Sequence, residues 1–588
     1  MNTFPLIRTR WSNEHVMAAV LIVLILYHFP MWLKDPMGIL RTVVLIVFGL
    51  LIDAICIIIR NRRIWCCVSS AVTAAMISLL TPNVPFWGQF IGVIIALLLG
   101  KQLFGGTGKN KINPALCGVL FLYILFGAPS TIFTPTWLLL PAIILGLVFI
   151  PIRPYASVAF ILGMSLAILF SGELNVVQVL EYGVFFWGCL VMTDPVTITK
   201  GPISGAICGF LVGFLPLLIT HNPIGLIIFI LIINLVGDEI SKYLDASKKN
   251  ARTNLKIPKL YQDSPEITFI DLTKKGLNSL ETGAKNELTK EEILNRIEKN
   301  RVFGMGGAAF STIEKIRAVM NAEIANKYFI INGVECDPGL VHDKWLLQNC
   351  FEDIRKGIEL LQSCIEFKST YLAIKDGNEV FEHDQLNICK VSNHYPIGAE
   401  KLLIETVLKR SLSSQEIPAT QGILVLNVQT VYTIALAVYH DEPVRSKFLT
   451  VADLKSKSAK VVQVPIGLKL KDLMEQVYPG NRTIFAGGGI MQAHLVEEDA
   501  VVEPSVNFVA AGIIPDYKES PQCSGCGLCS RHCPISLEVR KIVDFVESGK
   551  IEEAISYGAR ECISCGSCSY VCLAGKNLTE KVKRAKYK

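Results

Sequence analysis

The distribution of charge along the chain limits its fold more than any other feature of the sequence. Residues 1–240 contain 12 Lys and Arg and 8 Asp and Glu, whereas the other 348 residues carry 45 basic and 43 acidic side chains. So apolar a stretch predicts a membrane domain, and the remainder has the composition of globular domains. A disordered chain and a wholly soluble enzyme are excluded. A net charge of +6 over 588 residues is too small to indicate a nucleic-acid binder.

Within residues 1–240, ten apolar runs are long enough to cross or nearly cross a bilayer. We therefore predict a polytopic α-helical membrane domain of about ten spans in contact with the lipid bilayer. Several runs contain Pro or Gly, so we expect some kinked or half-spanning helices. The runs lie at 15–33, 37–59, 64–81, 84–100, 114–127, 137–152, 155–171, 178–192, 203–220 and 224–237.

The charges in the loops predict the orientation of these spans. When the N-terminus is placed in the cytoplasm, only Lys34 and Arg41 among the loop cations fall on the opposite side. This distribution satisfies the positive-inside rule. An even number of spans would then return the globular half to the cytoplasm. We expect a multi-pass protein whose two termini and cysteine-rich end are cytoplasmic, with no cleaved signal peptide.

Two loops of the membrane half are candidate cofactor sites. A glycine-rich loop between two spans lets backbone N–H groups approach a ligand closely, although a tight turn between helices would use the same residues. A hydroxyl-rich turn after a later span is the second candidate, with a helix cap as the alternative. The candidate residues are Gly105, Gly106, Gly108, Asn113, Thr193 and Asp194.

Two carboxylates in or beside the spans are candidates for moving a cation or a proton. Carboxylates inside a membrane are costly and are therefore often functional. Asp53 and Glu181 have such positions. The alternative is that both lie near helix ends and are solvated.

The globular half begins with a polar, Lys-rich linker at 241–295 and continues with a mixed α/β pattern. A glycine turn that leads into a helix can cradle phosphate, although alone it could be only a turn. A strand followed by a loop with acids and an amide comes next, and it suits hydrogen bonds to ribityl, ribose or amide groups. Together they predict a flavin or dinucleotide site on Gly304, Gly306, Gly307, Thr312, Lys315, Asn332, Glu335 and Asp337.

Two runs of four cysteines near the C-terminus give the most specific signal in the chain. Their x2-x2-x3 spacing matches the bacterial two-cluster ferredoxin pattern, in which the fourth cysteine of each run binds the other cluster. Zinc also accepts four thiolates, but two complete runs with this spacing favour clusters. We predict a first [4Fe-4S] cluster on Cys523, Cys526, Cys529 and Cys572, and a second on Cys562, Cys565, Cys568 and Cys533.

With these motifs, the chain resembles a fusion of two components of the Rnf-type ion-translocating ferredoxin:NAD oxidoreductase complex, its D-type membrane subunit followed by its C-type flavin and iron-sulfur subunit. The membrane half also resembles the relative of the D-type component in the sodium-pumping NADH:quinone reductase. Its matching segments are Gly105-Gly106-x-Gly108-x-Asn110-x-x-Asn113-Pro114 and Thr193-Asp194-Pro195-Val196-Thr197. The segments that match the C-type component, besides the cysteine runs, are Gly304-x-Gly306-Gly307-Ala308, Asn332-Gly333-x-Glu335-Cys336-x-Pro338, Tyr395-Pro396-x-Gly398-x-Glu400-Lys401, Asn427-Val428-x-Thr430 and Gly487-Gly488-x-x-Met491.

The resemblance implies a bacterial cell membrane protein that works with other subunits of such a complex and with ferredoxin or NADH. It implies a non-covalent FMN and NADH on a fold shared with the flavin subunit of complex I, with Asn427 and Thr430 closing over the flavin. The implied domains are 1–240 in the membrane, 241–295 as linker, 296–455 for FMN and NADH, 456–515 as a β-grasp-like segment and 516–588 as the two-cluster ferredoxin-like domain.

Departures from the family pattern limit this transfer. Ala309 stands where the family has a glycine, and Ser311 where it has a proline, which weakens the case for NADH more than for flavin. The loop whose threonine carries covalent FMN in the D-type membrane subunit has no counterpart, so covalent flavin is not predicted. A second flavin in the membrane half stays an open alternative.

Three functions compete, and no catalytic residue is identified. The leading hypothesis is a membrane electron-transfer oxidoreductase that joins a cytoplasmic donor or acceptor to a membrane acceptor, with Na⁺ or H⁺ translocation left open. The second is a membrane-anchored iron-sulfur relay without NADH chemistry or ion pumping. The third is a cation channel or transporter gated by a redox sensor, which would depend on Asp53, Glu181 and Asp194.

Overall fold

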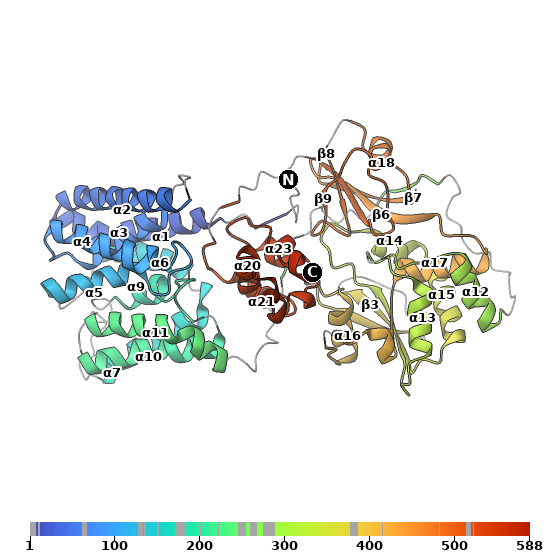
Figure 1. The fold of residues 1–588 in the computed structure, drawn as a ribbon, viewed down its shortest axis with the longest axis horizontal. Coiled ribbons are helices and arrows are strands. Elements are labelled where there is room, and N and C mark those ends of the chain that lie inside the picture. The colour runs from blue at the N-terminus through green and yellow to red at the C-terminus, as the bar shows by residue number, and fades with distance from the viewer. Residues whose placement is uncertain are drawn as a thin grey trace.

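The computed structural model forms an elongated molecule with helices at one end, two β-sheets at the other and the cysteine-rich region between them (Figure 1). The C-terminal region thus lies between two parts that precede it in the sequence. The described residues are 7–9, 12–61, 68–127, 133, 137–149, 152–170, 181, 183–199, 201–220, 223–244, 255–258, 261, 267–273, 288–307, 309–376, 386–413, 415–480, 483–512, 519–520 and 523–588.

Each apolar run expected from the sequence overlaps a helical segment where the structure describes its residues. Among the described residues, four helices are long and apolar enough to cross a membrane, namely those that begin at Asn13, Met37, Pro202 and Pro223; the count of ten crossings stays a prediction. The segments are α1 (Asn13–Lys34), α2 (Met37–Asn61), α3 (Val68–Leu80), α4 (Phe86–Leu97) with η1 (Leu98–Gln102), α5 (Pro114–Phe126), η2 (Trp137–Leu139) with α6 (Leu140–Leu147), α7 (Pro154–Phe170), α9 (Val184–Phe186) with η4 (Trp187–Val191), α10 (Pro202–Thr220) and α11 (Pro223–Leu244).

The first sheet is four-stranded and wholly parallel, in the order β4-β3-β2-β5. The middle residues of its central strands are apolar and buried because helices cover both faces of a parallel sheet. The strands are β2 (Tyr328–Gly333), β3 (Ser369–Lys375), β4 (Asn387–Val391) and β5 (Ile423–Asn427). The helices are α12 (Lys290–Lys299), α13 (Thr312–Met320), α14 (His342–Asn349), α15 (Phe351–Cys364), α16 (Glu400–Leu408), η6 (Pro418–Gln421) and α17 (Val428–Tyr439).

The second sheet is six-stranded and mixed, in the order β1-β7-β6-β10-β8-β9, and it changes two expected domain boundaries. Strand β1 lies within the expected linker, and the boundary expected at 455 separates β6 from its antiparallel partner β7. Local composition cannot show such pairing, because it does not reveal which strands meet in the sheet. The elements are β1 (Phe269–Asp271), β6 (Ser446–Asp453), β7 (Ser458–Pro465), α18 (Leu470–Val477), β8 (Thr483–Gly487), β9 (His494–Leu495) and β10 (Phe508–Gly512).

The cysteine-rich region consists of short helices around a small core that includes cysteines of both runs. Its helices α20 and α23 pack together between the two larger parts of the molecule (Figure 1). The elements are α19 (Leu528–Arg531), α20 (Val539–Glu547), α21 (Ile551–Ser556), η7 (Ala559–Glu561), α22 (Ser567–Tyr570) and α23 (Leu578–Lys586).

Candidate functional site

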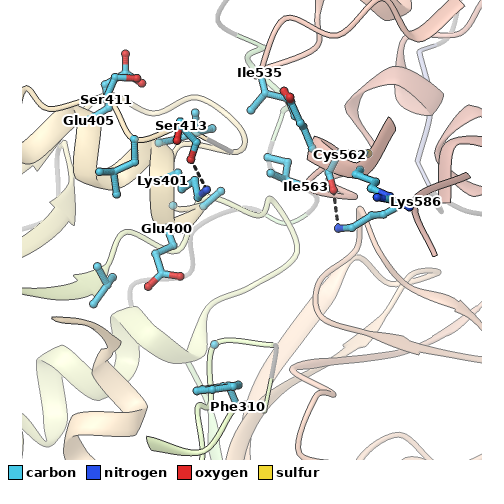
Figure 2. A pocket seen from close by; sticks show the side chains of 18 of the residues that line it. Phe310, Glu400, Lys401, Glu405, Ser411, Ser413, Ile535, Cys562, Ile563 and Lys586 are labelled. Atoms are coloured by element: carbon cyan, nitrogen blue, oxygen red, sulfur yellow. Dashed lines mark hydrogen bonds between the residues drawn. The ribbon is translucent and has the colours of Figure 1, made fainter. Parts of the chain in front are cut away.

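A cavity of about 1200 Å³ lies between the parallel sheet and the cysteine-rich region. Figure 2 shows Glu400 and Lys401 on one side of it and Cys562 and Lys586 on the other. A cavity of this size accommodates a cofactor and a second molecule. Seven of the residues expected to bind flavin or nucleotide line it, namely Gly304, Gly306, Thr312, Lys315, Asn332, Asn427 and Thr430.

The glycine turn is held in shape from two sides. Gly304 N–H donates to Phe310 O at 2.8 Å, and Met305 N–H donates to Thr430 Oγ1 at 2.9 Å. Thr430 therefore fixes the turn and also lines the cavity, and its closure over a flavin stays a prediction. Ala309 has a φ of +48°, in the left-handed region that favours glycine, so the departure from the family pattern falls where a side chain strains the backbone.

The N-terminus of α13 meets this turn and offers a place for an anion. Thr312 is the first residue of the helix and is 1% exposed. Its Oγ1 makes no hydrogen bond within the described part of the chain. A buried hydroxyl beside helix N–H groups is a suitable partner for a phosphate oxygen.

Lys315, the expected phosphate cation, already has partners. Its Nζ lies 2.7 Å from Glu400 Oε1 and donates to Val425 O at 2.9 Å. The Glu400 carboxylate offsets its charge, so a phosphate that approached Lys315 would have to compete with Glu400. Glu400 belongs to one of the motifs in the sequence, but nothing in that motif indicates its contact with Lys315.

The ends of strands β2 and β5 form a rigid part of the cavity wall. Asn427 Nδ2 donates to Asp343 Oδ2 at 2.7 Å and to Asn332 O at 3.3 Å. Asn332 Nδ2 donates to Gly398 O at 2.9 Å. These amides hold the wall together before any ligand binds. Asp343 is a further functional candidate because it accepts a hydrogen bond from Asn427, which lines the cavity.

Three expected site residues are not among those lining the cavity, namely Gly307, Glu335 and Asp337. Asp337 accepts hydrogen bonds from the N–H groups of Gly339, Ile490 and Met491, so it ties the loop after β2 to the second sheet. Glu335 accepts from Asp343 N–H at 2.8 Å, at the start of α14. Burial raises the pKa of both carboxyls. Their positions in the structure indicate a structural role rather than contact with a ligand.

The eight cysteines of the two runs surround two voids, and each void takes three cysteines from one run and one from the other. Backbone N–H groups point at sulfur, since Gly525 donates to Cys523 Sγ at 3.3 Å and Ser564 to Cys562 Sγ at 3.4 Å. In the described residues, no group of three or more His, Cys, Asp or Glu is placed to hold a single metal ion. The first void, here called the first cluster site, is lined by Cys523, Cys526, Cys529 and Cys572; the second cluster site is lined by Cys533, Cys562, Cys565 and Cys568.

The second cluster site shares a wall with the large cavity. Two contacts fasten this wall: Lys586 Nζ donates to Cys562 O at 2.7 Å (Figure 2), and Tyr395 Oη donates to Cys565 O at 2.6 Å. Four residues line both spaces, namely Ile535, Leu537, Cys562 and Ile563.

The first cluster site lies against the membrane half. Gly108 approaches Cys523 so closely that a Cβ at this glycine would lie 2.0 Å from Cys523 O. A smaller cavity of about 120 Å³ beside this contact is lined by the two candidate loops of the membrane half and by Ser524. Of the expected residues, Gly108, Asn113, Thr193 and Asp194 line it, whereas Gly105 and Gly106 do not.

Asp53 forms a buried ion pair in the membrane half. Lys101 Nζ lies 2.9 Å from Asp53 Oδ2, and the two side chains are 3% and 1% exposed, the lysine first. Ser70 Oγ and Gln102 Nε2 also donate to the carboxylate. Lys101 is therefore the buried partner of Asp53, and sequence spacing gives no sign of this pairing. Glu181 is half-buried, and its backbone O accepts from Phe133 N–H.

Three family models match separate parts of the chain. The NQR2, RnfD, RnfE family matches residues 1–142, the Nuo51 FMN-binding domain matches 297–436, and a 4Fe-4S dicluster domain matches 515–573. The order of these matches agrees with the expected order of membrane, flavin and iron-sulfur domains.

Curated relatives are similar to about half of this chain. The C subunit of the ion-translocating oxidoreductase complex of Haemophilus influenzae strain PittEE is 29% identical over 292 residues, which are 47% of this chain and 44% of that protein. The C subunit of the Na(+)-translocating ferredoxin:NAD(+) oxidoreductase complex of Acetobacterium woodii is 26% identical over 344 residues, 55% of this chain and 75% of that protein. The chain thus spans less than half the length of the Haemophilus relative.

Among solved structures, an NAD+-reducing [NiFe]-hydrogenase in the H2-reduced state is similar at 18% identity and a TM-score of 0.36, over 50% of this chain and 62% of that chain. The matches to family models and curated relatives confirm the resemblance seen in the motifs. The chain joins a segment related to the NQR2, RnfD and RnfE family to a segment related to the C subunit of ion-translocating oxidoreductase complexes, in the order of a fusion of the D-type and C-type components.

Proposed function

We propose that this chain is a membrane-bound oxidoreductase subunit that passes electrons between a cytoplasmic donor or acceptor and an acceptor in the membrane. One observation carries the proposal: the large cavity and the second cluster site share a wall that includes the ligand candidate Cys562. A cofactor in the cavity would lie against a sulfur ligand of the cluster. The first cluster site, next along the molecule, touches the membrane half at Gly108.

FMN is the cofactor that the large cavity suits best. Bound there, FMN would supply the exchange between two-electron and one-electron chemistry. Thr312 and the N–H groups at the start of α13 would hold its phosphate, and Gly304 and Gly306 would let the backbone approach it. The Tyr395 contact with Cys565 would keep the wall closed against water.

Two [4Fe-4S] clusters are proposed at the two cluster sites. The mixed origin of the cysteines around each void supports the ligand sets expected from the spacing. The N–H groups of Gly525 and Ser564 would stabilise the reduced clusters by donating to sulfur. Cluster ligation would also hold the two cysteine runs of this region together.

The setting is proposed from the charge pattern of the sequence and from the names of the relatives. We infer a multi-pass protein of a bacterial cell membrane with ten spans, with its termini and clusters in the cytoplasm, and with other membrane subunits as partners. NADH or ferredoxin would exchange electrons at the cytoplasmic side. Coupling to Na⁺ or H⁺ is proposed because relatives are named as ion-translocating, and a second flavin would have to use the small cavity beside Asn113.

A relay without NADH chemistry is the second candidate function. Two observations favour it: the Lys315 charge is offset by Glu400, and Ala309 strains the phosphate turn. We infer that both features oppose the binding of the additional phosphate groups that NADH would bring to a cavity that already holds FMN.

Anaerobic reconstitution tests the proposal. The full chain, purified in detergent, should contain FMN in an acid extract and about eight irons, as two four-iron clusters require. Bleaching of the flavin within seconds of adding NADH would support the oxidoreductase over the relay. Protein without flavin and with fewer than about four irons would refute both functions.

A further inference from the structure

A buried arginine of the membrane half reaches the first cluster site. Arg153 immediately precedes α7 and is 4% exposed. Its Nη2 donates to Pro195 O at 2.9 Å, in the Thr-Asp-Pro-Val-Thr segment, and to Cys526 O at 3.3 Å. One guanidinium thus joins a motif of the membrane half to the backbone of a cluster ligand that lies 373 positions away in the sequence.

The contact is reinforced by arginines from the opposite side. Arg531 Nη2 donates to Ile152 O at 2.9 Å, beside Arg153. Arg540 donates through Nη2 to Gly108 O at 2.5 Å and through Nη1 to Gly525 O at 3.3 Å. The cysteine-rich region and the membrane half therefore exchange hydrogen bonds in both directions, and the first cluster site lies at the centre of the exchange.

The Arg153 charge is only partly compensated. The hydrogen bonds described above join it to carbonyl oxygens, which orient a guanidinium without neutralising it. Its Nε is buried and makes no hydrogen bond in the described residues. Asp194 and Asp238 are its acidic neighbours, but Asp194 already accepts from Asn113 Nδ2 and Thr197 Oγ1.

We propose that Arg153 is a positioning residue through which the membrane half raises the reduction potential of the first cluster. One-electron reduction adds one negative charge to the cluster site. A buried cation beside the ligand backbone stabilises that added charge, and water screens it little. The cluster nearest the membrane half is thereby the better electron acceptor, and it is so only while the two parts are docked. The inference rests on the proposed function, since it requires a cluster at this site.

The test is an anaerobic redox titration of the full chain, in which EPR follows both clusters after reduction with dithionite. A Cys526→Ser variant identifies the signal of the first cluster. Arg153→Leu should lower the potential of that cluster, so that its reduced-to-oxidised ratio at a fixed ambient potential falls about tenfold, about 59 mV for one electron. Arg153→Lys, which keeps the charge, should retain most of the ratio. Arg355→Leu, which alters an arginine paired with glutamates on the surface of the α/β domain, is the control and should change neither cluster.

The possible outcomes separate an electrostatic role of Arg153 from a role in docking and from a role of its guanidinium geometry. An unchanged potential in Arg153→Leu refutes the inference. A raised potential also refutes it, because it would show that Arg153 acts by holding the two parts together. Their separation would expose the cluster to water, which favours the more charged reduced form. Equal shifts in Arg153→Lys and Arg153→Leu would show that only the guanidinium geometry matters and would overturn the electrostatic role. Wild-type protein without two clusters would instead contradict the proposed function itself.

Discussion

The close contact between Gly108 and Cys523 predicts that a side chain at Gly108 would weaken the docking of the cysteine-rich region on the membrane half. A methyl group at Gly108 would lie 2.0 Å from Cys523 O and 2.7 Å from Ser524 C, and both atoms are backbone. No side-chain rotation can relieve such an overlap, so the two loops would have to separate by about 1 Å or more to restore ordinary contact. The Arg540 hydrogen bond to Gly108 O would be lost with it.

The cost of this overlap can be separated from simple backbone strain by a matched control. Gly108 and Gly127 both have positive φ, +78° and +84°, but a Cβ at Gly127 meets nothing within 4 Å. Alanine at either position should cost about 1–2 kcal/mol of strain. Gly108→Ala should lose about 1.5–3 kcal/mol more, the typical contribution of a hydrogen bond to a charged group.

Amide hydrogen exchange measures this difference without relying on enzyme activity. Exchange in residues 523–531 should rise roughly tenfold to a hundredfold in Gly108→Ala, which corresponds to the lost 1.5–3 kcal/mol. The same segment in Gly127→Ala should exchange as in the wild type. If both variants protect residues 523–531 equally, the two halves are not held together by this contact, and the reasoning fails.

Three further predictions concern the α/β domain. Ala309→Gly should relieve the strain of a positive φ, stabilise the chain by up to about 1 kcal/mol and raise the affinity for NADH, as measured by thermal unfolding and by flavin bleaching. Burial raises the pKa of Glu335 above its ordinary value near 4.5, so the unfolded chain loses this proton at a lower pH than the folded chain does. Stability therefore falls as the pH rises from the ordinary pKa to the raised pKa of the folded chain. Glu335→Gln should flatten this fall in a series of melting curves, and an unchanged slope would show that Glu335 is not its source. Tyr395→Phe removes the hydrogen bond to Cys565 O and should cost about 1 kcal/mol and speed loss of iron to a chelator, whereas loss at the wild-type rate would show that this bond does not close the wall.

The parts of the site that depend on local spacing could be predicted from the sequence. The cysteine runs predict which four residues surround each void, because the ferredoxin pattern fixes the exchange of the fourth cysteine. The glycine turn before α13 and the strands β2 and β5 are predictable for the same reason: a turn signal and a short apolar run are local.

The parts that depend on distant partners could not be predicted. Glu335 and Asp337 have the residue types of ligand-binding acids, but backbone N–H groups of other elements take up their carboxylates. Lys101 and Arg153 follow the positive-inside pattern of loop cations, and both are buried by partners far away in the sequence. The pattern gives the side of the membrane on which a cation belongs, whereas burial depends on which segment folds over it.

The cysteine-rich region ends the chain but lies in the middle of the molecule (Figure 1). Its place depends on contacts with distant segments, which local spacing does not reveal. The first residues of the chain bind to it as well: Thr9 N–H donates to Tyr570 O at 3.1 Å, and Asn13 N–H donates to Leu573 O at 3.1 Å, on either side of Cys572. Fusion of the two halves in one polypeptide raises their effective concentration but leaves their orientation free. These backbone contacts, together with the hydrogen bonds of Arg540 to Gly108 O and of Arg153 to Cys526 O, fix the orientation. Folding, and not sequence order, therefore sets the order of the proposed redox sites.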